Sequence, residues 1–303
     1  MRAKKLLNLN LSFRTFAISL LIAANLLTAC QERKPVFGKQ AARRTLSDEF
    51  NKYWYADEAE ITSYNLEQAR YGEMRHGKAA LIFVTEHLLK DEEVKADESR
   101  DDNIAVLKLN TVKKFTTGIY PYSIMTSTFF PVVENRHALK VSNSVQEWCG
   151  LMYSQINSRE KFDVTSHSYF QGEADQTFSL EKDFLEDEFW TLIRVNPNGL
   201  PVGNHNVIPS LEFSNMHHIE KKAYPAILSK TNSTFTIHYS DLQRTITINF
   251  DPQFPHTING WSEAYVSGNK NLTSKATRIK TIKTPYWKQN GERFNYLRDS
   301  LQL

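Results

Sequence analysis

Cys149 carries a thiol that could act as a nucleophile. It lies in the segment Gln146-Glu147-Trp148-Cys149-Gly150. A thiol attacks only as the thiolate, and it needs a base, normally His, that lies close in space. His167 on a neighbouring predicted strand could supply that base for a thiol hydrolase, with Glu147 nearby. The residues around Cys149 do not match the papain pattern, so the alternative is a Cys149 that packs as a small apolar side chain.

Aromatic residues form the second candidate site. Seven of them could line an apolar pocket inside a curved sheet: Trp54, Tyr120, Tyr122, Phe129, Phe130, Trp148 and Tyr169. Ser and Thr residues are mixed among them, as in many ligand pockets. The simpler interpretation is that these rings fill the core, because aromatic side chains dominate core burial.

No metal or cofactor site is predicted. His217, His218 and Glu220 are close in sequence, but neighbouring side chains on a strand point to opposite faces, so only His218 and Glu220 would share a side. Two ligands do not complete a tetrahedral zinc site. The sequence also lacks a His-Glu-x-x-His, Cys-x-x-Cys, P-loop or dinucleotide-binding motif.

The first thirty residues have the layout of a lipoprotein signal peptide. Bases at positions 2, 4 and 5 precede an apolar run over 16–27, which is too short to cross a membrane comfortably. The run ends in Leu-Thr-Ala before Cys30, an order that resembles the lipobox of bacterial lipoproteins. The resemblance implies that Cys30 receives acyl chains such as palmitate and that the chain is cut before it. Gln31 is not the Asp that favours inner-membrane retention in enteric bacteria, so we expect a lipid-anchored outer-membrane protein that faces the periplasm.

Loss of residues 1–30 changes the charge balance. Four of the 37 bases and none of the 34 acids lie in that segment, so the remaining chain is near neutral. A near-neutral chain without a basic run argues against nucleic acid as a partner. We expect the membrane as one partner, through Cys30, and an apolar ligand or an envelope protein as another.

The pattern of elements predicts an α+β fold dominated by β-structure. Residues 31–49 are polar and without a period, so we expect a flexible tether there and a single β-rich periplasmic domain over 50–303. Segments 234–239 and 244–250 alternate in polarity and form the clearest hairpin. Phe184, Phe189 and Ile193 share one stripe, which predicts the main helix near 180–194. Many strands and one good helix predict a curved antiparallel sheet, similar to a half-barrel, packed on that helix.

Several short motifs are distributed from Tyr53 to the end of the chain. They are Tyr53-Trp54-Tyr55-Ala56 with Ala59-Glu60-Ile61, Arg70-Tyr71-Gly72-Glu73, Thr117-Gly118-Ile119-Tyr120-Pro121-Tyr122-Ser123, Gln146-Glu147-Trp148-Cys149-Gly150 and Arg298-Asp299-Ser300-Leu301. Together they resemble an uncharacterised family of Bacteroidetes lipoproteins, whose members often carry the label septum formation inhibitor Maf. Maf nucleotide pyrophosphatases are cytoplasmic α/β proteins that open with a Ser-x-Ser-Pro-Arg-Arg type motif, which this chain lacks. The resemblance therefore implies a lipoprotein family and supplies no functional residues.

These observations favour a membrane-anchored envelope lipoprotein that acts as a non-enzymatic binding or docking module, with an apolar ligand as one candidate. The alternative is an envelope thiol hydrolase that uses Cys149 and His167. A Maf-type nucleotide pyrophosphatase is the least favoured function, because the motif of its active site is missing.

Overall fold

The computed structural model describes residues 43–303 except 99 and 135. All of the described residues belong to one compact unit, Lys39–Leu303. The predicted signal peptide with Cys30, and positions 31–42 of the predicted tether, lie outside the described residues.

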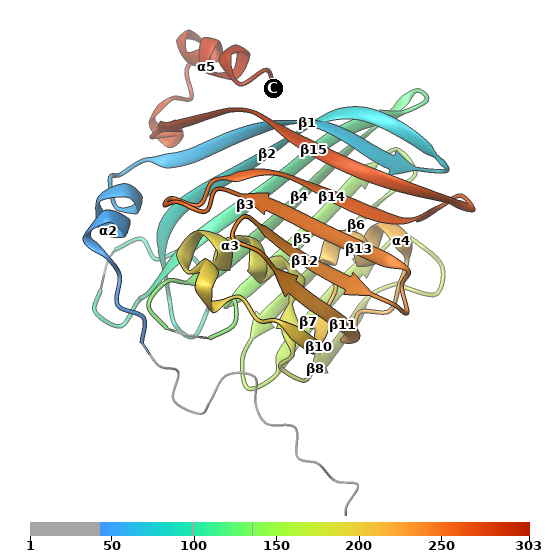
Figure 1. The fold of residues 1–303 in the computed structure, drawn as a ribbon, viewed down its shortest axis with the longest axis horizontal. Coiled ribbons are helices and arrows are strands. Elements are labelled where there is room, and N and C mark those ends of the chain that lie inside the picture. Colours follow the sequence, from blue (N-terminus) through green and yellow to red (C-terminus); the bar gives the residue numbers. More distant parts are fainter. Residues whose placement is uncertain (1–42, 99, 135) are drawn as a thin grey trace, which may run out of the picture. The chain divides into compact units, whose positions relative to one another are not determined.

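The described chain forms a sheet of 15 strands (Figure 1). Their order in space is β8-β7-β6-β5-β4-β3-β2-β1-β15-β14-β13-β12-β11-β10-β9, so neighbours in the sheet are neighbours in sequence except for β1 and β15. The pairs are antiparallel apart from the short parallel pair of β9 and β10. The strands are β1 (Ala59–Arg70), β2 (Glu73–Leu88), β3 (Ile104–Thr117), β4 (Tyr120–Pro131), β5 (Lys140–Glu147), β6 (Gly150–Ser158), β7 (Phe162–Ser168), β8 (Gln176–Leu180), β9 (Phe184–Leu185), β10 (Gly203–Ile208), β11 (Tyr224–Lys230), β12 (Thr234–Tyr239), β13 (Arg244–Phe250), β14 (Ile258–Ser267) and β15 (Lys270–Thr284).

Buried and more exposed side chains alternate along most strands. In β12 and β13, Phe235, Ile237, Ile246 and Ile248 are buried, and the threonines between them are partly exposed. A period of two directs one face of the sheet toward the core. The predicted hairpin is confirmed with the same bounds, because its turn and its alternation are both local in sequence.

Short helices connect and cover the strands. The α-helices are α2 (Asp48–Trp54), α3 (Glu186–Val195), α4 (Leu211–His217) and α5 (Asn295–Ser300), and the 3-10 helices are η1 (Pro197–Gly199), η2 (Tyr286–Lys288) and η3 (Glu292–Phe294). Within the described ranges, no helix combines the length and apolar composition that a membrane span requires.

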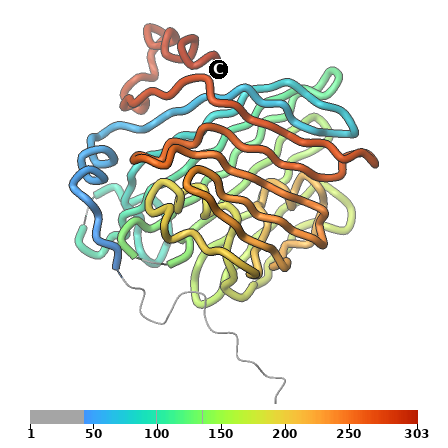
Figure 2. The backbone as a smooth tube through the Cα atoms, in the orientation of Figure 1, coloured from blue at the N-terminus to red at the C-terminus, as the bar shows by residue number. Residues whose placement is uncertain are grey.

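Helices α3 and α4 lie on the inner, concave face of the sheet. The ring of Phe189 in α3 lies 5.0 Å from that of Phe235 in β12, and the same helix contacts β3 and β4. Phe213 in α4 packs on Tyr265 of β14, while α4 also contacts β5 and β6. Strands from both halves of the sheet order touch the same helices, so the sheet curves around them, as Figure 1 and Figure 2 show.

The prediction of a β-dominated fold with an open, curved, mostly antiparallel sheet is confirmed. The main helix is shorter than predicted, because residues 176–180 form β8 and the helix begins only at Glu186. The side chain of Glu188 accepts a hydrogen bond from the backbone N–H of Leu185 at 3.2 Å, which caps the N-terminal end of the helix. Helix α4 was not predicted, since a segment of seven residues is too short to display a helical period.

The predicted tether over 31–49 extends too far toward the C-terminus. Arg43 pairs with Glu134 in an isolated bridge, and a guanidinium nitrogen of Arg44 donates to the carbonyl of Glu134 at 2.8 Å. Helix α2 then begins at Asp48, capped by Ser47, whose hydroxyl accepts the N–H of Phe50 at 3.1 Å. These contacts order residues 43–49, and the polar amino-acid composition of the segment does not predict them.

Candidate functional site

Cys149 lies in the turn between β5 and β6 and is exposed. The carboxylate of Glu147 accepts the backbone N–H of Cys149 at 2.7 Å. A hydrogen bond from the thiol to the same carboxylate raises the pKa of Cys149 above its usual value, and slight desolvation adds to this. A catalytic thiol requires the opposite setting, one that favours the thiolate.

His167 does not lie beside Cys149. It is on β7, directly opposite Tyr153 of β6. Tyr153 is four residues from Cys149, which corresponds to roughly 13 Å along a strand. The Nδ1 atom of His167 instead lies 2.9 Å from a carboxylate oxygen of Asp175. The thiol hydrolase hypothesis therefore lacks its base, because the turn and the strand register keep the two side chains apart.

The seven aromatic residues do not form one pocket. Phe129 and Phe130 are neighbours on β4, so they point to opposite faces of the sheet. Trp148 and Tyr169 are 69% and 73% exposed. The ring of Tyr120 contacts that of Trp148, with centroids 6.4 Å apart, near the β5–β6 turn.

The core interpretation is right for the buried members of this set. Trp54, Tyr122 and Phe130 are each 1% exposed. Tyr122 stacks on Phe115 with ring centroids 4.8 Å apart, and Trp54 packs on Phe83. The predicted pocket was therefore wrong, since a sequence pattern does not tell which face of a strongly curved sheet each ring occupies.

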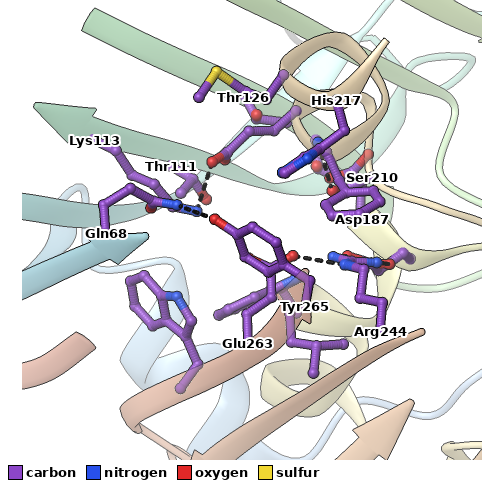
Figure 3. Close-up of a pocket in the computed structure, with 18 of the residues that line it drawn as sticks. Gln68, Thr111, Lys113, Thr126, Asp187, Ser210, His217, Arg244, Glu263 and Tyr265 are labelled. Atoms are coloured by element: carbon purple, nitrogen blue, oxygen red, sulfur yellow. Dashed lines mark hydrogen bonds and ion pairs between the residues drawn. The ribbon is translucent and has the colours of Figure 1, made fainter. Parts of the chain in front are cut away.

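The concave face contains a small polar chamber between the sheet and helices α3 and α4. Figure 3 shows Gln68 and Lys113 on one side of it and Asp187, His217 and Arg244 on the other. The chamber has a volume of about 40 Å³. One water molecule needs roughly 10–15 Å³ by this measure, so there is room for a few waters and none for an acyl chain.

Arg244 organises the charges around this chamber. Its Nη2 and Nε atoms each lie 2.6 Å from a carboxylate oxygen, the first of Glu186 in α3 and the second of Glu263 in β14. The Nζ atom of Lys113 in β3 lies 2.7 Å from Glu212 of α4. These buried charges thus have partners, as burial requires. The network attaches both helices to the sheet.

Two further groups in the chamber, the buried Asp187 and the partly buried His217, have no ion pair within the described ranges. Burial raises the pKa of Asp187 to about 7, and the nearby charge of Glu186 adds to the effect. Asp187 accepts the backbone N–H of Leu211 at 3.0 Å, which places its carboxylate at the start of α4. Burial also lowers the pKa of His217 to about 4. Both side chains are therefore held in their neutral forms more readily than in water.

An apolar opening, which we call the C-terminal groove, lies on the outer, convex face of the sheet. It has a volume of about 520 Å³ and lies between the sheet and the segment over 284–303. Its lining consists of Ile61, Ala80, Ile82, Asn110, Val112, Met125 and Ile282 from the sheet and Thr284, Tyr286, Gln289, Asn290, Gly291, Phe294, Asn295, Leu297, Arg298, Leu301 and Leu303 from that segment. Arg298 has the one charged side chain of this lining, whose side chains include no carboxylate, imidazole or thiol.

The floor of the C-terminal groove follows the strand register. Ile282, Ile61 and Ile82 stand in one row across β15, β1 and β2. Ala80 and Val112 face each other in the next row, across β2 and β3. Rows of aliphatic side chains on an outer face give an apolar floor where solvent-facing residues are usually polar.

The C-terminal segment forms the other wall of this groove. Leu301 is 4% exposed, whereas Phe294 and Leu297 are only partly buried. The segment is therefore anchored at Leu301 and leaves apolar surface uncovered beside it. The signal for this site in the sequence is the continuous apolar run over 79–84, since both faces of a strand are covered when no polar residue interrupts it.

A larger cleft of about 960 Å³ lies beside α2. Its lining is mostly polar and includes Glu49, Asn196, Lys230, Asn232 and His256. It does not fit the apolar ligand that the sequence suggested. Within the described ranges, no three His, Cys, Asp or Glu side chains are grouped so that they could hold a metal ion.

Comparisons with known proteins give no family for this chain. No family model and no curated protein matches it. A solved structure of a β-barrel-like protein of a domain of unknown function from Brucella abortus is similar at 8% identity, with a TM-score of 0.43, and covers 75% of this chain and 97% of its own. A porin-like protein from Bacteroides uniformis is similar at 8% identity, with a TM-score of 0.20, over 74% of this chain and 95% of its own. The chain is therefore similar to proteins described as β-barrel-like and porin-like, at TM-scores that assign it to neither.

Proposed function

We propose that this chain is a lipoprotein of the bacterial cell envelope that binds an apolar ligand in the C-terminal groove and catalyses no reaction. Acyl chains on Cys30 anchor it in the outer membrane, and the folded unit faces the periplasm. The lipobox-like order before Cys30, and the resemblance to Bacteroidetes lipoproteins, support the anchor.

The observation that carries the proposal is the composition of the C-terminal groove. Its volume of about 520 Å³ falls in the range of roughly 300–1,000 Å³ of small-molecule sites. Aliphatic side chains form most of its floor, and its lining has no side-chain carboxylate, His or Cys that could act in acid–base or nucleophilic catalysis. Such a surface favours an apolar ligand.

The concave face supports the same assignment. Its chamber holds only about 40 Å³, and buried ion pairs hold α3 and α4 against that face. An acyl chain would have to displace these helices and break buried charge pairs. The outer groove requires no such rearrangement.

Mass spectrometry of bound material tests the proposal. The chain from residue 31 onward, secreted behind an ordinary cleavable signal peptide and purified without detergent, is extracted with organic solvent. Val112→Trp places an indole on the groove floor, and Ile227→Trp places one on β11, at a position that is 50% exposed. We expect a stoichiometric apolar molecule in the wild type and in Ile227→Trp, and a loss of most of it in Val112→Trp.

An empty wild-type protein would count against an apolar ligand and would favour docking of an envelope protein. Equal occupancy in both tryptophan variants would place the ligand outside the C-terminal groove. The anchor has its own test, in which cells are labelled with an alkyne analogue of palmitate. The wild type should become labelled, and Cys30→Ser should not.

A further inference from the structure

Two lysines stand opposite each other just beyond one end of the C-terminal groove, outside its lining. Lys78 of β2 is directly opposite Lys114 of β3 in the strand register. Directly opposed side chains have their Cβ atoms about 4.5–5.5 Å apart, and like charges at that distance destabilise a strand pair. An anion bound by both ammonium groups would reduce this repulsion.

The register places this lysine pair beside the apolar floor. Lys78 precedes Ala80 by two residues on β2, and Lys114 follows Val112 by two on β3. Residues two apart share a face, and the strands are antiparallel, so both lysines stand on the outer face at the same end of the groove. The separation from the floor is roughly 7 Å along each strand.

Other cations lie around the same part of the outer face. Lys280 on β15 lies opposite Ser63 of β1, which in turn lies opposite Ala80 of β2. The Nζ atom of Lys280 donates to the hydroxyl of Ser300 at 2.6 Å. Arg298 of α5 lines the groove itself. These side chains and the lysine pair therefore surround one end of an apolar surface with positive charge.

Within the described ranges, no side-chain carboxylate forms an ion pair with these cations. The Nζ atom of Lys78 donates to the neutral amide oxygen of Asn65 at 2.9 Å. Glu67, on the same face of β1, stands one row further away and is opposite Lys275. The arrangement of an apolar floor next to unneutralised cations is complementary to a molecule with an apolar tail and an anionic head.

We propose that the C-terminal groove takes a phosphate-bearing lipid, with its acyl chain on the isoleucine floor and its phosphate on Lys78 and Lys114. This inference rests on the proposed function and adds the chemical class of the ligand. The phosphate accepts hydrogen bonds from the two ammonium groups, and Arg298 and Lys280 contribute further positive charge from the side. Charge-assisted hydrogen bonds of this kind are stronger than those between neutral groups.

Binding of three probes to the chain from residue 31 onward tests this inference. Dodecyl phosphate carries the tail and the anion, dodecyl maltoside carries the tail alone, and inorganic phosphate carries the anion alone. Isothermal titration calorimetry, at concentrations below the critical micelle concentration of each amphiphile, gives the affinity for each probe. We expect dodecyl phosphate to bind at least about tenfold more tightly than either of the other probes, which corresponds to roughly 1.4 kcal/mol.

A charge-matched pair of variants locates the effect. Lys78→Gln/Lys114→Gln should reduce the affinity for dodecyl phosphate to that for dodecyl maltoside and leave the neutral probe unchanged. Lys52→Gln/Lys90→Gln removes the same net charge at two exposed positions away from the groove and should keep the preference. Thermal unfolding of both double variants confirms that each is folded, and the first should be no less stable, since it removes a repulsive pair.

Each outcome separates this inference from the function on which it rests. Equal affinity of the wild type for dodecyl phosphate and dodecyl maltoside would overturn the phosphate assignment and leave the apolar site intact. Binding of neither amphiphile would overturn both proposals. Inorganic phosphate that binds as tightly as dodecyl phosphate would identify a free anion as the ligand and would also overturn the lipid assignment.

Discussion

Glu60 of β1 and Arg194 of α3 form a buried ion pair with two hydrogen bonds, although 134 residues separate them in sequence. The two donor–acceptor distances are 2.7 and 2.6 Å, and the side chains are 0% and 1% exposed. The guanidinium also lies over the rings of Trp54 and Phe83, 4.9 and 4.5 Å from their centroids. This contact attaches the main helix to the sheet at the point where β1 meets β15.

Glu60→Gln should destabilise the fold by roughly 3–5 kcal/mol, because it leaves the charge of Arg194 buried without a counter-ion. Urea unfolding followed by circular dichroism measures the change. Glu181→Gln removes the partner of Lys161 in an exposed ion pair and should leave the unfolding midpoint close to that of the wild type. A Glu60→Gln midpoint equal to that of Glu181→Gln would show that the buried pair does not hold α3 in place.

The stability of Asp187→Asn relative to that of the wild type should increase as the pH rises from about 4 to about 7. The carboxyl of Asp187 has a pKa raised to about 7 by burial and by the nearby charge of Glu186, whereas in the unfolded chain it ionises near 3.8. Its contribution to stability is therefore complete below the unfolded pKa and is lost as the pH rises to the folded one. Asn keeps an oxygen for the N–H of Leu211 and has no proton to lose in this range.

The difference in unfolding free energy between Asp187→Asn and the wild type, measured in urea at several pH values, reports this group alone. His217 acts with the opposite sign, since a pKa lowered to about 4 makes stability rise between pH 4 and 6.5. It is present in both proteins, so its effect cancels in the difference. Each unit of pKa shift corresponds to about 1.4 kcal/mol. A difference that stays constant from pH 4 to 8 would contradict the prediction.

Gly77→Ala should destabilise the pairing of β2 with β3 by roughly 1–3 kcal/mol. A Cβ atom at this position would lie 2.2 Å from the carbonyl oxygen of Lys114 and 2.8 Å from the Cβ of Phe115, so the strands would have to separate. Thermal unfolding measures the effect. Gly291→Ala is the matched control, because its Cβ meets open space and its φ is −90°. Equal melting temperatures for the two variants would show that β2 and β3 tolerate the added carbon.

Glu147→Gln should increase the rate at which an aromatic disulfide reagent labels Cys149 near pH 8. The hydrogen bond and the negative charge of Glu147 raise the pKa of the Cys149 thiol, and their loss increases the fraction of thiolate. Glu160→Gln, in the exposed turn between β6 and β7, provides a control for net charge. Slower labelling of the Glu147→Gln protein would mean that Glu147 activates the thiol, and the hydrolase hypothesis would regain support.

The C-terminal groove shows how much of the candidate site could be predicted from the sequence. An apolar run such as that over 79–84 is typical of a strand covered on both faces. It could not indicate that the cover on the outer side is the C-terminal segment, more than 200 residues later, or that this cover is incomplete. The position of Lys114 opposite Lys78 depends on the register of β2 and β3, which the turns and the buried face determine together.

The sequence by itself determined the β-dominated class, the hairpin of β12 and β13 and a helix with Phe189 and Ile193 on one stripe, because alternation and helical periodicity are local properties. Only the tertiary structure decided which residues meet. The contact of β1 with β15 and the ion pair of Glu60 with Arg194 join segments that are distant in the chain. The curvature of the sheet then decided that its inner face is filled by α3 and α4 and that the apolar opening lies on its outer face.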